Sequence, residues 1–238
     1  MLDQSNVEED FSEVIKNLQL LKDSNHQKVI LFATGSYCPV HYGHLQVFDA
    51  ASKFLTEKYN IDVLAGYISP SCDLYVDSKL RSESIPFSDR LEMIKRACLE
   101  HNSQSNVIHI LTSSWEGLQP TFIDFPTVRD HFQEMVDKTF PSENIKVIYI
   151  AGADLFVKCW LHNWSQCIAI ERPGSLSLSK YETDLSEMIY ICNDPTYSEY
   201  YVDTSSTKMR EKYHKKESLQ GLTYPSVIEY LETVLHWK

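Results

Sequence analysis

Residues 33–44, which read Ala-Thr-Gly-Ser-Tyr-Cys-Pro-Val-His-Tyr-Gly-His, join an apolar run at 28–34 to an amphipathic segment at 44–59. The apolar run predicts a β-strand and the amphipathic segment an α-helix. Gly35 lets the backbone approach a phosphate, and a helix start offers free N–H groups and a positive dipole end. His41 and His44 add imidazole donors. One histidine at a strand end is more often structural, but this combination indicates phosphate chemistry.

Strands and helices are predicted to alternate along the rest of the chain. Strand patterns occur at 61–69, 106–112, 145–151, 167–171 and 188–192, and helical patterns at 87–100, 127–140 and 153–162. This alternation predicts an α/β fold with a doubly wound parallel sheet, whose ligands bind beyond the carboxyl ends of the strands. We expect a single domain over 1–238: an N-terminal extension (1–27) with a helix at 7–22, a core (28–204), and a C-terminal helical segment (205–238) with helices at 205–214 and 225–236.

Composition limits the partners and the compartment. The 238 residues carry a formal net charge of −11, which predicts that the surface repels nucleic acid and anionic membranes. An apolar run of about 18 residues and a signal peptide are both lacking, so we expect no membrane span and an intracellular protein, in the cytoplasm or else the nucleus. Six scattered cysteines without a C-x-x-C pair predict reduced, mostly buried thiols and argue against a zinc cluster or a thioredoxin-like centre. Whether the chain forms a homo-oligomer is left open.

A second motif lies near the C-terminus. Ser205, Ser206 and Thr207 form a Ser/Thr-rich turn before a predicted helix that carries Arg210. Hydroxyl and N–H groups at such a helix start can receive phosphate oxygens, and an arginine one turn later can clamp them. On its own this turn is more often an ordinary helix cap. Its pairing with the two histidines favours a triphosphate site.

Together the two motifs resemble the nucleotidyltransferases that carry His-x-Gly-His. Segments in the middle of the chain narrow the resemblance to eukaryotic-type nicotinamide/nicotinate mononucleotide adenylyltransferases. They are Ser69-Pro70-x-x-Asp73-x-Tyr75, Phe87-Ser88-Asp89-Arg90, Trp115-Glu116-Gly117-Leu118-Gln119, Gly152-Ala153-Asp154-Leu155 with Trp164 beyond it, and Arg172-Pro173-Gly174. The resemblance covers about residues 28–230 and implies a Rossmann-like nucleotidyltransferase fold. It also implies transfer of AMP from ATP to a pyridine mononucleotide, giving NAD or deamido-NAD and pyrophosphate, with Mg²⁺ bound through the ATP phosphates.

The resemblance also assigns site residues. The expected catalytic residues are His41, His44 and Arg210, and His44 is expected to stabilise the α-phosphate as it reacts. The expected ATP-binding residues are Gly35, Ser36, His41, His44, Gly152, Asp154, Ser205, Ser206, Thr207 and Arg210. The expected mononucleotide-binding residues are Ser36, Tyr37, Lys79, Trp115, Glu116, Trp164 and Arg172.

Several assignments keep alternatives. Trp164 is expected to stack on the pyridine ring, with Trp160 as the competing residue, and Asp154 can equally cap the next helix. The family usually has lysines directly after the Ser-Pro-x-x-Asp-x-Tyr segment, whereas here Lys79 comes later, so either Lys79 or Arg81 would replace them. Neither the amide or acid preference nor a role for the tyrosine-rich segment 197–201 follows from the sequence.

Two other functions remain open. The first is a nucleotidyltransferase with another acceptor, such as a cytidylyltransferase or a phosphopantetheine adenylyltransferase. The second is a nucleotide-binding or chaperone-like protein without turnover. A dinucleotide-binding dehydrogenase and a P-loop NTPase are disfavoured, because neither G-x-G-x-x-G nor G-x-x-x-x-G-K-[ST] occurs.

Overall fold

The computed structural model describes residues 9–197 and 201–235. Within them, strands that pair in parallel form one six-stranded sheet with the order β3-β2-β1-β4-β5-β6. The strands are β1 (Lys28–Gly35), β2 (Asp62–Pro70), β3 (Ile110–Thr112), β4 (Lys146–Gly152), β5 (Cys167–Ile170) and β6 (Ile189–Cys192). The strand order reverses between β1 and β4, which is the switch point of a doubly wound sheet. The predicted fold class is therefore confirmed.

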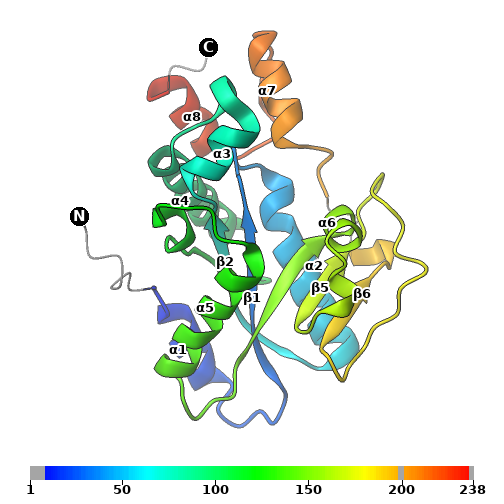
Figure 1. Cartoon of the computed structure of the whole chain (residues 1–238). Coiled ribbons are helices and arrows are strands. Elements are labelled where there is room, and N and C mark those ends of the chain that lie inside the picture. Colours follow the sequence, from blue (N-terminus) through cyan, green and yellow to red (C-terminus); the bar gives the residue numbers. More distant parts are fainter. Residues whose placement is uncertain (1–8, 198–200, 236–238) are drawn as a thin grey trace.

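Helices cover both faces of this sheet (Figure 1). They are α1 (Ser12–Leu20), α2 (Tyr42–Tyr59), α3 (Asp73–Leu80), α4 (Phe87–Gln104), α5 (Phe125–Thr139), α6 (Ala153–Lys158), α7 (Ser206–His214) and α8 (Pro225–Thr233). Short 3₁₀ turns lie at Arg81–Glu83, Glu116–Leu118, Leu161–Asn163 and Pro195–Tyr197. The helices α1 and α5 pack on one face, and α2 and α4 on the other.

Strand β1 is buried on both faces. Val29, Leu31 and Ala33 pack into the cluster that includes α2 and α4, while Ile30 and Phe32 point to the cluster that includes α1 and α5. Successive side chains of a strand point to opposite faces, so a continuous apolar run is what a central parallel strand requires. Strand β1 ends at Gly35, beside the switch point between β1 and β4. A ligand cleft is expected at this position of a doubly wound sheet.

Four predicted elements differ in extent. The strand expected at 106–112 pairs only over Ile110–Thr112. The helix expected at 153–162 ends at Lys158, because Trp160 adopts a left-handed backbone conformation with φ of 58°. The N-terminal helix expected at 7–22 is observed at Ser12–Leu20, and its predicted first residues lie outside the described residues. The helix expected at 225–236 ends earlier, at Thr233, which lies within the described residues.

Helix α3 was not predicted. Its sequence, Asp-Leu-Tyr-Val-Asp-Ser-Lys-Leu, has no apolar stripe, and only Val76 is buried. A helical pattern depends on such a stripe, so a short helix that lies on the surface escapes it.

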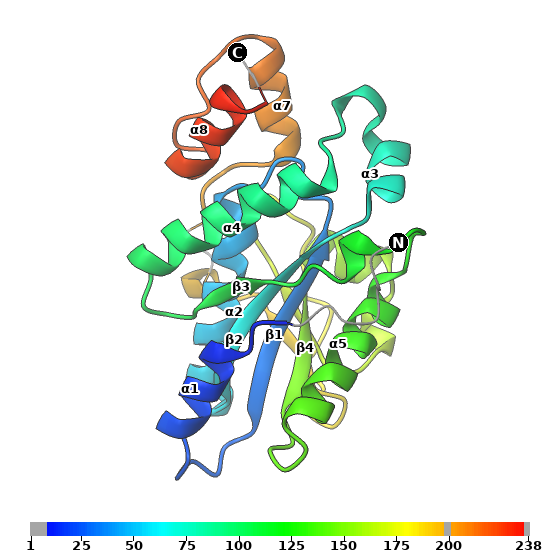
Figure 2. The same cartoon turned by 90° about the vertical axis from the view of Figure 1, so that its left-hand side faces the viewer.

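The C-terminal helices α7 and α8 lie beyond the end of the sheet at which β1 stops (Figure 2). The Thr223 hydroxyl donates to the carbonyl of Val40 at 2.8 Å, and the Tyr230 hydroxyl donates to a carboxylate oxygen of Asp89 in α4 at 2.7 Å. These bonds hold the C-terminal segment against the loop after β1. The two sequence motifs are thereby brought to the same end of the molecule.

The six cysteines are free thiols, and five of them are buried, as predicted. Burial raises the pKa of the Cys38 and Cys98 thiols, which keeps them protonated. Among the described residues, no helix is both long and apolar enough to cross a membrane.

Candidate active site

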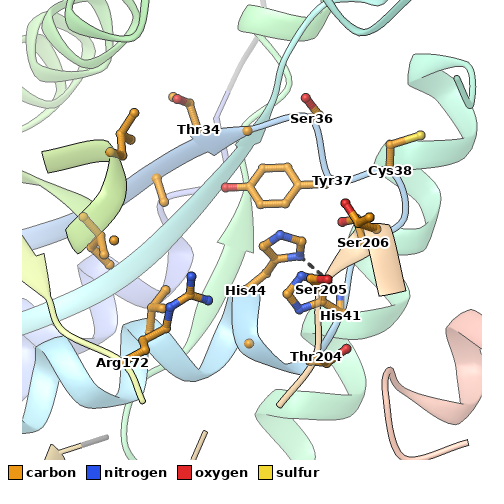
Figure 3. Close-up of a pocket in the computed structure, with 18 of the residues that line it drawn as sticks. Thr34, Ser36, Tyr37, Cys38, His41, His44, Arg172, Thr204, Ser205 and Ser206 are labelled. Carbon is orange, nitrogen blue, oxygen red and sulfur yellow. Dashed lines mark hydrogen bonds between the residues drawn. The ribbon is translucent and has the colours of Figure 1, made fainter. Parts of the chain in front are cut away.

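A cavity of about 380 Å³ lies at the carboxyl ends of β1 and β4, between the loop after β1 and the start of α7 (Figure 3). Most of the predicted site residues line this cavity. They are Gly35, Ser36, Tyr37, His41, His44, Lys79, Gly152, Arg172, Ser205, Ser206, Thr207 and Arg210. Residues that are far apart in the sequence thus meet in one pocket, at the position that the sheet topology predicts.

The two histidines form a stacked pair at the start of α2. Their ring centroids are 3.5 Å apart with an interplanar angle of 25°, and the Tyr37 ring lies edge-on to His44 at 4.8 Å. The backbone N–H of His41 donates to Nδ1 of His44 at 3.1 Å. Because Nδ1 accepts this bond, a neutral His44 ring carries its proton on Nε2. His44 therefore has an N–H donor on the edge of the ring that does not bind the backbone.

Burial disfavours the charged form of both imidazoles. Burial lowers the pKa of His41 to about 3, and the Arg172 charge acts in the same direction. Burial also lowers the pKa of His44, with His41 as the next cause. The sequence suggested charge-assisted donors, whereas burial favours these rings as neutral N–H donors. A bound polyphosphate would favour their protonated forms.

The depressed pKa of His41 predicts a pH-dependent stability. Between pH 6.5 and about 3 the unfolded chain binds a proton at His41 that the folded chain does not. The free energy of unfolding should therefore fall by about 1.4 kcal/mol per pH unit as the pH drops below 6.5, and His41→Gln should lack this contribution. Urea denaturation of both proteins at pH 7 and pH 5.5 measures the difference. The control is His26→Gln, an exposed histidine before β1, and a constant wild-type to His41→Gln difference would contradict the prediction.

The start of α7 faces the histidines. The Ser205 hydroxyl caps the helix by accepting from the N–H of Lys208 at 3.1 Å, and the Ser206 hydroxyl donates to the carbonyl of Pro39 at 2.8 Å. Among the described residues, Nδ1 of His41 and the Thr204 hydroxyl are buried without a hydrogen-bond partner. Both groups belong to the lining of the cavity. Buried polar groups rarely lack a partner, so a polar ligand here would satisfy them.

Three cationic side chains surround the same cavity in a chain of net charge −11. Lys79 Nζ lies 3.3 Å from the Ser36 hydroxyl, and Arg81, the alternative to Lys79, does not line the cavity. Arg210 donates through Nη1 to the Cys38 carbonyl at 2.9 Å and through Nε to Glu83 at 3.2 Å. With Arg172, these groups make a local positive site for an anion, although the overall charge repels one.

Four predicted site residues do not line this cavity. Asp154 accepts from the N–H of Leu176 at 3.4 Å and lines a neighbouring depression together with Arg172. The rings of Trp115 and Trp164 stack on His131 and Phe125, with centroids 3.7 and 5.0 Å apart. Glu116 is buried.

Trp164 is nevertheless connected to the cavity. Thr34, which lines it, shares a 2.9 Å hydrogen bond with the Tyr149 hydroxyl. The Tyr149 ring stacks on Phe125 at 5.0 Å, and Phe125 in turn stacks on Trp164. Phe125 thus occupies a face of Trp164 in this structure. The side chain of Trp160, the competing residue, is 66% exposed and does not line the cavity.

Sequence reasoning missed the role of Arg90, which is completely buried in α4. Its guanidinium donates to the carbonyls of Ile85, Ser36 and Ser71 at 2.8, 3.0 and 2.7 Å, and to Asp73 at 2.9 Å. These bonds fix the loop after β1 to the end of β2. An arginine near a helix start is usually exposed, so only its place in the Phe87-Ser88-Asp89-Arg90 segment could have drawn attention to it.

The comparisons with known proteins agree with this fold. The chain belongs to the cytidylyltransferase-like family, whose sequence model matches residues 32–212. More particularly, it is 29% identical to nicotinamide/nicotinic acid mononucleotide adenylyltransferase 1 of Saccharomyces cerevisiae, over 89% of this chain and 56% of that protein. It is 27% identical to the Arabidopsis thaliana protein named nicotinamide/nicotinic acid mononucleotide adenylyltransferase, over 85% of this chain and 87% of that protein.

The chain therefore spans little more than half the length of the yeast relative. Among solved structures, it resembles nicotinic acid mononucleotide adenylyltransferase of Plasmodium falciparum in complex with APC, with a TM-score of 0.56. That match has 17% sequence identity and covers 89% of this chain and 98% of the other. At this identity the likeness supports the fold.

Proposed function

We propose that this chain transfers AMP from ATP to nicotinamide or nicotinate mononucleotide, which gives NAD or deamido-NAD and pyrophosphate. The observation that carries the proposal is the meeting of the two motifs in one cationic cavity, where Arg210 binds the backbone of Cys38 from 172 residues away. The names of the relatives in yeast and plants support the choice of acceptor. A nucleotidyltransferase with another acceptor is the alternative that the experiment below must exclude.

In this proposal the triphosphate lies between the His41/His44 pair and the start of α7. An oxygen of the mononucleotide phosphate attacks the α-phosphorus of ATP, the bond to the β-phosphate oxygen breaks, and pyrophosphate leaves. The Nε2–H of His44 donates to an α-phosphate oxygen, and Arg210 with the α7 N-terminus binds the leaving phosphates. Positioning and charge stabilisation account for the rate without a nucleophilic side chain.

The described residues do not group three or more His, Cys, Asp or Glu side chains in a way that could hold a metal ion. A Mg²⁺ ion fits such a site through the phosphates of ATP, because Mg²⁺ keeps several waters and uses few protein ligands. Bound in this way it would neutralise part of the phosphate charge. Ser206 and Thr207 line the cavity and would be candidates for water-mediated contacts with such an ion.

For the acceptor we propose Ser36, Tyr37, Lys79 and Arg172, which line the cavity beside the histidines. The pyridine ring would extend toward the Thr34–Tyr149–Phe125–Trp164 series, where flat rings offer stacking partners. In this arrangement the ring displaces Phe125 from Trp164.

The direct test is release of pyrophosphate from ATP and Mg²⁺ in parallel reactions. The acceptors are nicotinamide mononucleotide, nicotinate mononucleotide, phosphopantetheine and none, and His44→Ala is the inactive control. Release that requires a pyridine mononucleotide supports the proposal and ranks amide against acid. Release with another acceptor only, or none at all, contradicts it.

Arg210 tests the triphosphate half of the site. Arg210→Ala should raise KM for ATP by about 10- to 100-fold, because a hydrogen bond to a charged group contributes about 1.5–3 kcal/mol. KM for the mononucleotide should change little. The matched control is Lys212→Ala on the same helix, where the lysine pairs with Glu217 instead of lining the cavity. Unchanged ATP affinity in Arg210→Ala would place the triphosphate elsewhere.

A further inference from the structure

Glu9, which lies just before α1, is hydrogen-bonded to the loop at 113–118 that carries Trp115. The Ser113 hydroxyl donates to Oε1 of Glu9 at 2.7 Å, across 104 residues of sequence. The backbone amides of Ser114 and Trp115 act on the same carboxylate and lower its pKa, but burial has the larger effect and raises that pKa to about 7. One partly buried carboxylate thus faces three consecutive residues of this loop.

Residues 9–14, here called the N-terminal arm, are attached to the rest of the protein by contacts other than those of Glu9. The Tyr67 hydroxyl donates to the Asp10 carbonyl at 2.6 Å. The Phe11 ring lies 5.8 Å from Tyr67 and 5.9 Å from Phe132, and Val14 is completely buried. These contacts attach residues 9–14 to the sheet and to α5 independently of the Glu9 carboxylate. Loss of that carboxylate should therefore affect the loop more than the arm.

The loop connects to the candidate active site through Glu116. Its Oε2 accepts from the Ser69 hydroxyl at 2.8 Å, at the end of β2. Two residues further on, the N–H of Ser71 donates to the Gly35 carbonyl at 2.9 Å. A continuous set of contacts thus runs from Glu9 through Trp115–Glu116 and the end of β2 to the wall of the cavity.

A carboxylate is a costly residue for a merely structural contact. Desolvation of a charged group disfavours burial, and no cationic side chain is among the groups that act on Glu9. Its advantage is acceptor capacity, because two carboxylate oxygens can accept several donors at once. The hydroxyl of Ser113 and the two backbone amides are such donors.

We propose that Glu9 is a positioning residue that acts through the Trp115–Glu116 turn and the end of β2 on the cavity wall at Gly35 and Ser36, so that residues 9–14 support the mononucleotide half of the site. The inference rests on the proposed function. The family's sequence model begins at residue 32, so the arm lies outside the region that defines the family.

The test compares Glu9→Ala and Glu9→Gln with Glu13→Ala, a control in α1 of the same arm. Glu9→Ala should raise KM for the mononucleotide by about tenfold or more, because a small displacement of a positioning contact is costly. KM for ATP and the melting temperature should stay near those of Glu13→Ala. Glu9→Gln should recover part of the loss, because its amide oxygen can still accept from Ser113.

Hydrogen exchange of the peptide that spans 113–118 gives a readout that does not need turnover. Exchange should be faster in Glu9→Ala and unchanged in Glu13→Ala. An unchanged mononucleotide KM in Glu9→Ala, or equal rises in both KM values with a lower melting temperature, would overturn the inference. If the wild-type protein shows no pyridine-dependent turnover, the proposed function fails, and unchanged exchange at 113–118 then overturns the positioning role separately.

Discussion

His44→Ala is expected to lower kcat for pyrophosphate release by about 10²- to 10³-fold, with a much smaller change in KM for ATP. The magnitude is that of removing one preorganised donor from a developing charge, about 3–4 kcal/mol. In this chain the donor is Nε2–H, because Nδ1 of His44 accepts the N–H of His41. An interaction made mainly in the transition state affects kcat and kcat/KM together. Steady-state kinetics with saturating mononucleotide measure both.

Two amide variants separate the donor from the helix cap. His44→Asn places an oxygen near the position of Nδ1 and lacks the distant donor, so it should keep the fold and lose turnover as alanine does. His44→Gln can place an amide N–H near the position of Nε2 and should recover part of the rate. Loss of a preorganised donor lowers kcat by about 10²- to 10³-fold, so turnover of His44→Ala within about threefold of wild type would remove His44 from the mechanism.

The central fold could be predicted because its elements have strong local patterns. The apolar run of β1 and the amphipathic α2 meet at Gly35, and both were predicted within two residues of their ends. The sequence pattern predicts an element less well where its buried side chains do not recur at a helical or strand spacing. Helix α3 has a single buried residue, Val76, and the left-handed Trp160 ends α6 inside an otherwise helical pattern.

The candidate site could be predicted in part for a similar reason. Residues that belong to one of the two short motifs, such as His41 and Ser205, were identified from the sequence, and they line the cavity. The stacking of Phe125 on Trp164, and of His131 on Trp115, depends on how α5 packs on the sheet. No local sequence pattern encodes that packing. Both tryptophans were expected to line the cavity, and in this structure they stack on these two rings instead.

Buried charges were the hardest feature to predict. Most acidic and basic residues lie on the surface, so composition does not predict that Arg90 is buried. Glu116 was expected to bind the mononucleotide, and nothing in the sequence predicts that it is buried and bonded to Ser69. Their role depends on carbonyls and hydroxyls that come from other strands. Glu116 shows the physical consequence, because burial raises its pKa to about 7 although Ser71 and Ser69 hydroxyls lower it.

Arg90→Met should lower the free energy of unfolding by about 3–5 kcal/mol, the usual cost of removing one partner from a buried charged network. Methionine roughly fills the volume, so the effect reports lost hydrogen bonds more than a cavity. The carbonyls of Ser36 and Ser71 and the Asp73 carboxylate would each lose the donor that Arg90 now supplies. Arg90→Lys keeps the charge but not the planar fork, and we expect it to restore less than half of the loss. Urea denaturation at neutral pH measures each variant.

The matched control is Arg96→Met, on the same helix, where the arginine is 37% exposed and pairs with Glu92 at 2.8 Å. Exposed pairs of this spacing contribute about 0.3–0.5 kcal/mol, so this variant should remain close to wild type. Because the lost bonds also hold the loop at Ser36, Arg90→Met should raise KM for the mononucleotide even at temperatures where it stays folded. Equal stability of the two methionine variants would contradict this prediction and would mean that water replaces the guanidinium. The loop after β1 would then be held by the Gly35–Ser71 backbone hydrogen bond and by its contact with α7.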